Sequence, residues 1–196
     1  MNKNSFLRST KICVALLALT MGFMSCNENT ATAQSKTAVS SKIKVVPEMD
    51  IHAAVVAGNI EAVKQHIAAG TDLNEKDAMG GSSPLITACL FDRKEIAKLL
   101  IDAGANINFQ NNDGSTPLHV AAFFCKPDMV QLLMENNASK TLKNKYNNTA
   151  YEIVTSPFST VKSIYEQMKQ ILEPMGVKLD LPYIEKTRPV IAGMLK

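Results

Sequence analysis

Residues 115–124, STPLHVAAFF, have the features of a short helix with two large aromatic side chains at its end. Thr116 is of a type favoured at the N-cap of a helix, and Pro117 suits the first helical position, where its missing N–H group loses no hydrogen bond. Ala121 and Ala122 allow a second helix to approach closely. The stretch therefore predicts a helix with a close neighbour, and it raises the question of what its two aromatic rings face.

The same pattern recurs along the chain at a constant spacing, which is typical of stacked helical repeats. The Ser-Pro-Leu motif at Ser83 recurs as the Thr-Pro-Leu motif at Thr116, and Thr149 follows at the same interval. Gly70 and Gly104, each within an Ala-Gly pair, are separated by that interval and one additional residue. A unit of this length is too small to bury its own apolar face, so neighbouring units must stack.

The repeating unit resembles that of the ankyrin-repeat family. Residues 114–122, GSTPLHVAA, are similar to the opening of the family's unit, and residues 95–108, EIAKLLIDAGANIN, are similar to its second half. The resemblance covers about residues 50–172 and implies an all-α repeat solenoid of about four helix-turn-helix repeats, with β-turn fingers and a helical C-terminal cap. It also implies that His119 joins neighbouring repeats by hydrogen bonds. Gly104 follows the second helix of its unit, where a left-handed C-cap is favoured.

Both ends of the predicted stack depart from the pattern. The first repeat, residues 50–74, lacks the Thr-Pro opening and has His66 where later repeats have leucine, which suits an end unit with one side facing water. In the last repeat we expect the second helix over residues 159–172. After it, Asp180 is expected to cap a short helix and Pro189 to begin another, and together these form the cap that closes the stack.

The start of the chain has the composition of an export signal. Basic residues precede residues 12–24, a run of mostly apolar residues that is shorter than the roughly 20 needed to span a bilayer. The Ser-Cys pair ending at Cys26 resembles a bacterial lipobox, in which the cysteine is lipidated; cleavage after Ala33 is the alternative. The expected parts are a signal peptide (1–25), a flexible tether (26–46), the ankyrin-repeat domain (47–176) and the helical cap (177–196). We therefore expect a protein of the bacterial cell envelope, lipid-anchored at the outer membrane or free in the periplasm.

Charge and motifs argue against nucleic-acid binding and catalysis. The chain has 21 basic and 18 acidic residues, and Lys3, Arg8 and Lys11 of the signal account for the whole net charge of +3. A neutral mature chain has no bulk electrostatic attraction for nucleic acid. The sequence has neither a glycine-rich phosphate loop nor a Gly-x-Ser-x-Gly or Cys-x-x-Cys motif, so we predict no enzyme, cofactor or metal. An active site in the tail, built on Asp180 and Glu185, is the remaining alternative.

Two cysteines remain once Cys13 and Cys26 are assigned to the signal and the lipid site. Cys89 and Cys125 belong to neighbouring repeats and are offset by one helical turn. Their Cα atoms are expected about 10 Å apart, beyond the roughly 7 Å that a disulfide accepts. We predict two separate thiols, of which Cys125 is the more exposed.

A protein partner is the remaining expectation, because solenoids bind along their concave faces. The apolar residues after the alanine pairs and the tips of the fingers are the candidate contacts, although Phe123 is equally suited to covering its own helix pair. The partner-binding candidates are Leu90, Phe91, Phe123, Phe124, Met79, Asn112 and Tyr146. An accessory or immunity factor that inhibits or protects an envelope enzyme or toxin is the alternative function. The sequence leaves the oligomeric state and the identity of the partner open.

Overall fold

Residues 47–196 are the part of the chain that the computed structural model describes, and they lie within one compact unit. None of the described residues belongs to a β-strand. The helices are α1 (Ile51–Ala57), α2 (Ile60–Ala69), α3 (Pro84–Leu90), α4 (Lys94–Asp102), α5 (Pro117–Phe123), α6 (Pro127–Glu135), α7 (Ala150–Thr155), α8 (Phe158–Leu172), the 3-10 helix η1 (Glu173–Met175) and α9 (Leu181–Leu195). The expected signal, tether and lipidation site at Cys26 lie outside the described residues and stay predictions.

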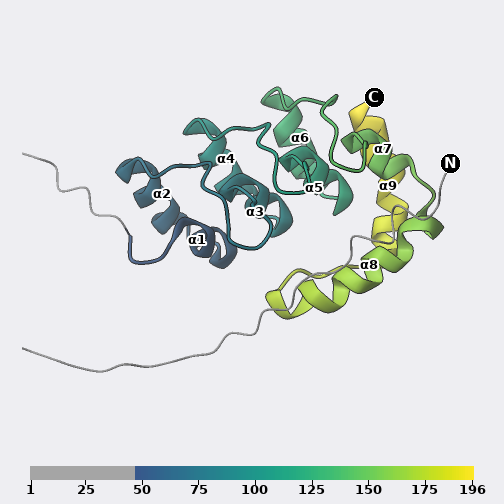
Figure 1. Ribbon diagram of the computed structural model, residues 1–196, viewed down its shortest axis with the longest axis horizontal. Helices are drawn as coiled ribbons and strands as arrows, with labels where there is room; N and C mark the ends of the chain where they lie inside the picture. Colours follow the sequence, from purple (N-terminus) through teal and green to yellow (C-terminus); the bar gives the residue numbers. More distant parts are fainter. Residues whose placement is uncertain (1–46) are drawn as a thin grey trace, which may run out of the picture. The chain divides into compact units, whose positions relative to one another are not determined.

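The helices stack in two layers (Figure 1). The first layer holds α1, α3, α5 and α7, each packed against the next in chain order. The second layer holds α2, α4 and α6, which pack in the same order against one another. The apolar side chains between the layers form one continuous core, as expected for an all-α repeat solenoid.

Four equivalent polar residues begin the helices of the first layer. Asp50, Ser83, Thr116 and Thr149 are the N-caps of α1, α3, α5 and α7, and each side chain accepts a hydrogen bond from the backbone N–H three residues later. The interval between successive caps is the same throughout. Asp50 therefore caps the first helix where the Thr-Pro opening is missing, because a carboxylate satisfies the free N–H groups as a hydroxyl does.

The ends of the second-layer helices recur at the same interval, with one additional residue between the first two. Gly70, Gly104 and Asn137 follow α2, α4 and α6, and all three have the left-handed backbone conformation, with φ of 63°, 89° and 64°. The predicted left-handed C-cap at Gly104 is therefore confirmed. Asparagine tolerates this conformation better than most residues, which explains its presence at the third position.

The last repeat is built differently from the prediction. The helix that packs against both α6 and α7, and so takes the second-layer position, is α9 rather than α8. The helix predicted over residues 159–172 does form, as α8. It lies outside the two layers, however, and packs on the ends of α3 and α5 (Figure 1). The prediction assigned the second-layer position to the next helix in the chain, and α8 is an insertion between the two helices of the repeat.

The tail of the chain is one helix rather than two. Asp180 caps α9 as predicted, because its carboxylate accepts a hydrogen bond from the backbone N–H of Tyr183 at 3.1 Å. Pro189 does not begin a second helix but lies inside α9. Ile191 and Leu195, which follow Pro189, are buried in the core of the stack. Their burial holds the helix together across the hydrogen bond that proline cannot donate.

Candidate protein-interaction surface

Three loops, the fingers, join each second-layer helix to the next repeat, and the turn at each tip is held by one polar side chain. Asp77 accepts hydrogen bonds from the backbone N–H groups of residues 79–82, at 2.7–3.2 Å. The amide oxygen of Asn111 accepts from residues 113 and 115, and that of Asn144 accepts from residues 146 and 148. These three residues occupy equivalent places in successive repeats. Sequence reasoning missed them, although short polar residues at the repeat period were the available signal.

Neighbouring fingers are joined to one another near their tips. The backbone N–H of Asn112 donates to the carbonyl of Gly80 at 2.9 Å, and that of Lys145 donates to Asp113 at 2.9 Å. Closer to the helices, side chains make the equivalent link: Asn74 accepts from the N–H of residue 106, and Asn108 from that of residue 139, both at 2.8 Å. The three fingers therefore form one hydrogen-bonded row, which fixes the relative positions of their tips.

We call the tips of this row, residues 77–82, 111–115 and 144–148, the finger surface. Met79 is 83% exposed and Tyr146 is 44% exposed, and Asn112 is also exposed. Burial and the neighbouring Asp113 carboxylate raise the pKa of the Tyr146 hydroxyl, so it stays protonated at neutral pH. Met79, Asn112 and Tyr146 thus lie at the tips of neighbouring fingers of one hydrogen-bonded row.

The histidines tie helices to fingers. Nδ1 of His119 accepts from the N–H of Thr116 at 3.2 Å, and Nε2 donates to the carbonyl of Asn148 in the next finger at 3.0 Å. Burial lowers the pKa of His119, although its hydrogen bonds to backbone carbonyls partly oppose this shift. Nε2 of His52 donates in the same way to the carbonyl of Glu75, at 3.1 Å. These contacts support the structural role that the family resemblance implies.

The prediction that His66 faces water at the end of the stack is wrong. Its ring is buried, and Nε2 donates to the carbonyl of Met49 at 2.7 Å while Nδ1 lies 3.0 Å from the hydroxyl of Thr71. The residues before α1 fold over the ring, which the repeat pattern did not indicate.

In the described range, no group of histidine, cysteine and carboxylate side chains is placed to hold a metal ion.

The cysteines are separate and both are buried. Cys89 and Cys125 are free thiols, as predicted. The prediction that Cys125 is the more exposed is wrong, because its sulfur lies 3.6 Å from the carbonyl of Ile184 and the start of α9 covers it. Burial raises the pKa of the Cys125 thiol to about 11 and also raises that of Cys89. Neither thiol therefore ionises near neutral pH, and a protonated thiol is a poor nucleophile.

The apolar residues at the ends of α3 and α5 do not form an open surface. We call Leu90, Phe91, Val120, Phe123 and Phe124 the aromatic patch. All five pack in a second core with residues of α8 and of the segment leading into α9. Phe124 is only 6% exposed, so its expected role as an open partner contact is corrected, and Leu90 and Phe91 are half-buried in the same cluster. The ring of Phe123 stacks on that of Tyr165, with centroids 4.5 Å apart, in keeping with the packing alternative.

A buried hydrogen-bond network fixes α8 to its neighbours. The hydroxyl of Tyr165 donates to the carbonyl of Phe123 at 2.7 Å and accepts from Nη1 of Arg188 at 3.1 Å. Nη2 of Arg188 donates to the carbonyls of Ile153 and Ser156, at 2.8 and 2.7 Å, where α7 ends. The guanidinium thus satisfies carbonyl groups that a helix end leaves free. Sequence reasoning missed both residues because their partners are distant in the sequence.

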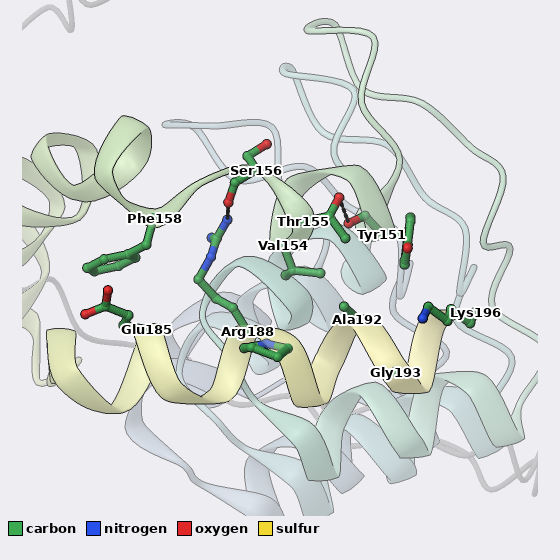
Figure 2. Close-up of a pocket in the computed structure, with 11 residues that line it drawn as sticks. Tyr151, Val154, Thr155, Ser156, Phe158, Glu185, Arg188, Ala192, Gly193 and Lys196 are labelled. Carbon is green, nitrogen blue, oxygen red and sulfur yellow. Dashed lines mark hydrogen bonds between the residues drawn. The ribbon is translucent and has the colours of Figure 1, made fainter.

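Arg188 also lines a cleft of about 450 Å³ between α7, the start of α8 and α9. Figure 2 shows the side chain extending from α9 toward Ser156, with Phe158 on one side and Val154 on the other. Glu185, one of the two carboxylates of the alternative active site, lines the same cleft, while Asp180 is used as the cap of α9. The three hydrogen bonds that Arg188 donates all go to protein oxygens. Its guanidinium therefore has a structural role in this cleft, where it joins α7, α8 and α9.

Among the described residues, no helix is both long enough and apolar enough to cross a bilayer.

Comparisons with known proteins agree with this architecture. A family model described as "Ankyrin repeats (3 copies)" matches residues 51–144. Protein phosphatase 1 regulatory subunit 27 of Homo sapiens, and the protein of the same name from Mus musculus, are each 39% identical to this chain over 63 residues, which is 32% of this chain and 40% of each relative. The crystal structure of the ankyrin repeat domain of Bcl-3, described as a unique member of the IkappaB protein family, superimposes with a TM-score of 0.51 at 33% identity, over 53% of this chain and 45% of its own. The chain thus spans less than half the length of these curated relatives. Together with the stacked helix pairs, these matches show that residues 51–144 are ankyrin repeats within an all-α solenoid.

Proposed function

We propose that this chain is a non-catalytic protein-binding module that holds its partner on the finger surface. The carrying observation is Met79, whose side chain is 83% exposed on a turn that Asp77 fixes through four hydrogen bonds. Methionine is a flexible, polarisable side chain that adapts to the shape of a partner, and it is common at protein-binding surfaces. Ankyrin repeats suggest a protein–protein interaction module, and the burial of the aromatic patch moves the expected contact from the helices to the fingers.

The finger surface has the properties of a prearranged binding site. Its tips are linked by backbone hydrogen bonds, so binding orders little that is not ordered already. Methionine and tyrosine are both enriched at protein interfaces, and Met79 and Tyr146 stand at the two ends of the row with Asn112 between them. A partner of complementary shape would contact all three fingers at once.

One observation favours a regulatory role for the binding. The two curated relatives are described as regulatory subunits of a phosphatase, so each acts with a catalytic partner. By similarity, we propose that this chain binds an enzyme and changes its activity. This is the accessory or immunity factor predicted from the sequence, and the expected export signal and lipid at Cys26 make its proposed target an enzyme or toxin of the cell envelope.

The binding proposal is tested by cross-linking in cells and capture of the tagged protein. Met79→Asp with Tyr146→Asp is the test variant, and Val190→Asp, which changes a 56% exposed side chain of α9, is the matched control. One partner should be captured by the native chain and the control and lost with the test variant. Capture of the same partner by all three would show that binding uses another surface.

The anchor is tested separately, by replacing Cys26 with serine and following the protein through fractionation of the envelope. Lipidation predicts that the native chain is recovered with the membrane and incorporates labelled fatty acid, while Cys26→Ser does neither. Cleavage after Ala33 predicts instead a soluble mature chain that begins at Gln34, in both forms.

A further inference from the structure

Helix α8 contacts the aromatic patch through a single stripe of apolar side chains. The apolar residues of α8 that pack in the second core follow a seven-residue pattern, at positions one, four, eight, eleven and fifteen of the helix. They are Phe158, Val161, Tyr165, Met168 and Leu172. This is the spacing by which one helix packs along another apolar surface in coiled coils. The contact is therefore that of an amphipathic helix seated on an apolar site.

The opposite face of α8 is not attached to the repeats. Lys162 pairs with Glu166 at 3.9 Å and Lys169 pairs with Glu173 at 3.5 Å, so the ion pairs that α8 makes within the described range stay inside the helix and its 3-10 extension. One polar contact reaches the aromatic patch, from the hydroxyl of Tyr165 to the carbonyl of Phe123. Apolar contact and this single hydrogen bond thus hold α8 against α3 and α5, and on the side of α9 the same hydroxyl accepts from Nη1 of Arg188.

The stack is complete without α8. Since α9 takes the second-layer position of the last repeat, the core between the layers includes no residue of α8. The helix begins after Pro157 with no side-chain cap, and it ends in η1 and the left-handed Gly176. A helix that is connected through two short segments and excluded from the main core opens at a lower free energy than the repeats unfold.

We propose that the aromatic patch is a helix-binding site that α8 keeps closed, and that its outside ligand is an amphipathic helix of a partner protein. That helix carries apolar residues at the seven-residue spacing of α8, with an aromatic residue at the centre. The resident helix is the argument for this occupant, because it shows which shape and which side-chain spacing the patch accepts. This inference concerns a second surface and does not depend on the finger surface.

The closed state has a physical reason. With α8 lifted, the aromatic rings of the patch would face water together, and an exposed apolar patch of this kind promotes association. An incoming helix with the same stripe replaces the contacts of α8 one for one. Its apparent affinity is lowered by the fraction of molecules that are closed, so α8 sets the threshold for binding.

The test uses a fluorescently labelled peptide with the sequence of residues 158–172 and the whole chain. In the opened variant, Val161→Asp with Met168→Asp, two half-buried residues of α8 become charged while the aromatic patch is unchanged. In the matched control, Ser163→Asp with Gln170→Asp, the same charges enter at the same spacing on the exposed face of the helix. Fluorescence anisotropy measures peptide binding to each chain.

We expect the opened variant to bind the peptide at least about tenfold more tightly than the native chain, with the control like the native chain. A peptide that carries the Val161→Asp and Met168→Asp changes should not bind. Equal binding to the native chain and the opened variant, no binding to either, or equal binding of both peptides would overturn the proposal. Dimers of the native chain that exchange α8 would make the occupant a second copy and would overturn it also.

Hydrogen exchange on the native chain keeps the inference testable if the opened variant does not fold. The backbone amides of α8 should exchange with solvent before those of α3, α5 and α9. If the amides of α8 exchange only together with those of the repeats, then α8 does not open separately and the closed-site proposal is wrong.

Discussion

Replacing Tyr165 with phenylalanine isolates the hydroxyl that joins α8 to the repeats. The ring of Tyr165 is fully buried and stacks on Phe123, and phenylalanine keeps this packing. Only the hydroxyl is lost, with its hydrogen bonds to the carbonyl of Phe123 and to Nη1 of Arg188. Burial raises the pKa of Tyr165 to about 12, so the group that is removed is the neutral hydroxyl at any ordinary pH.

The expected loss follows from the two groups that remain. The carbonyl of Phe123 and one nitrogen of Arg188 are left without this partner in a buried place, and each such loss costs about 1–3 kcal/mol. Arg188 keeps two other hydrogen bonds, so the lower value applies to it, and with the same minimum for the carbonyl the total is at least about 2 kcal/mol. For a chain of this size that corresponds to a fall in Tm of about 4–8 °C.

The assay is urea unfolding followed by far-UV circular dichroism, with the melting temperature as a second readout. Tyr183→Phe is the matched control, because the side chain of Tyr183 is 48% exposed on α9, and its free energy of unfolding should change by less than about 0.5 kcal/mol. If Tyr165→Phe changed stability no more than this control does, the hydroxyl would not hold α8 in place, and the reasoning from the network would be refuted.

Three other perturbations test the repeat geometry and its dependence on pH. Gly104→Ala should lower the free energy of unfolding by about 1 kcal/mol, because φ is 89° at this position and no atom lies within 4 Å of the new methyl group. Asn137→Gly, at the equivalent position, should not destabilise the chain. If Gly104→Ala left the melting temperature unchanged, the conformational explanation would be wrong. The Gly81→Ala methyl group would clash with the exposed side chain of Asn112, which must turn away, and the φ of 64° strains any residue other than glycine, so this change should cost about 1 kcal/mol; unchanged NMR shifts of the Asn112 side-chain amide would contradict it. Because burial lowers the pKa of His119 below 6.5, the unfolded chain takes up the proton first, and stability should fall as pH drops below about 6.5 and level off below the folded pKa. His119→Gln should show a flatter dependence of the unfolding free energy between pH 7 and pH 5, and an equally steep dependence would show that other groups cause it.

The local parts of the fold were predictable from sequence because their causes are local. Thr116 caps a helix through the N–H three residues away, and Gly104 is left-handed because of the helix that it ends. Both kinds of residue recur at the repeat period and need no knowledge of distant partners. The turn residues Asp77 and Asn111 belong to the same class, and the period would have identified them.

The parts that failed depend on contacts between distant segments. Phe124 and Cys125 follow the repeat pattern, but their burial is caused by α8 and by Ile184, which the repeat does not contain. The choice between α8 and α9 for the last repeat had the same origin. Both helices are fifteen residues long with an apolar stripe, and only the packing against α6 and α7 distinguishes them.

The insertion of α8 between the two helices of the last repeat also affects the order in which the protein folds during synthesis. The repeats before α7 are each completed by the helix that follows directly, so they can pack as soon as they leave the ribosome. The last repeat has to wait until residues 181–195 emerge and the intervening segment closes into a loop. Until then the faces of α6 and α7 that α9 covers stay exposed, and exposed apolar surface of this kind makes a partly folded chain prone to aggregate.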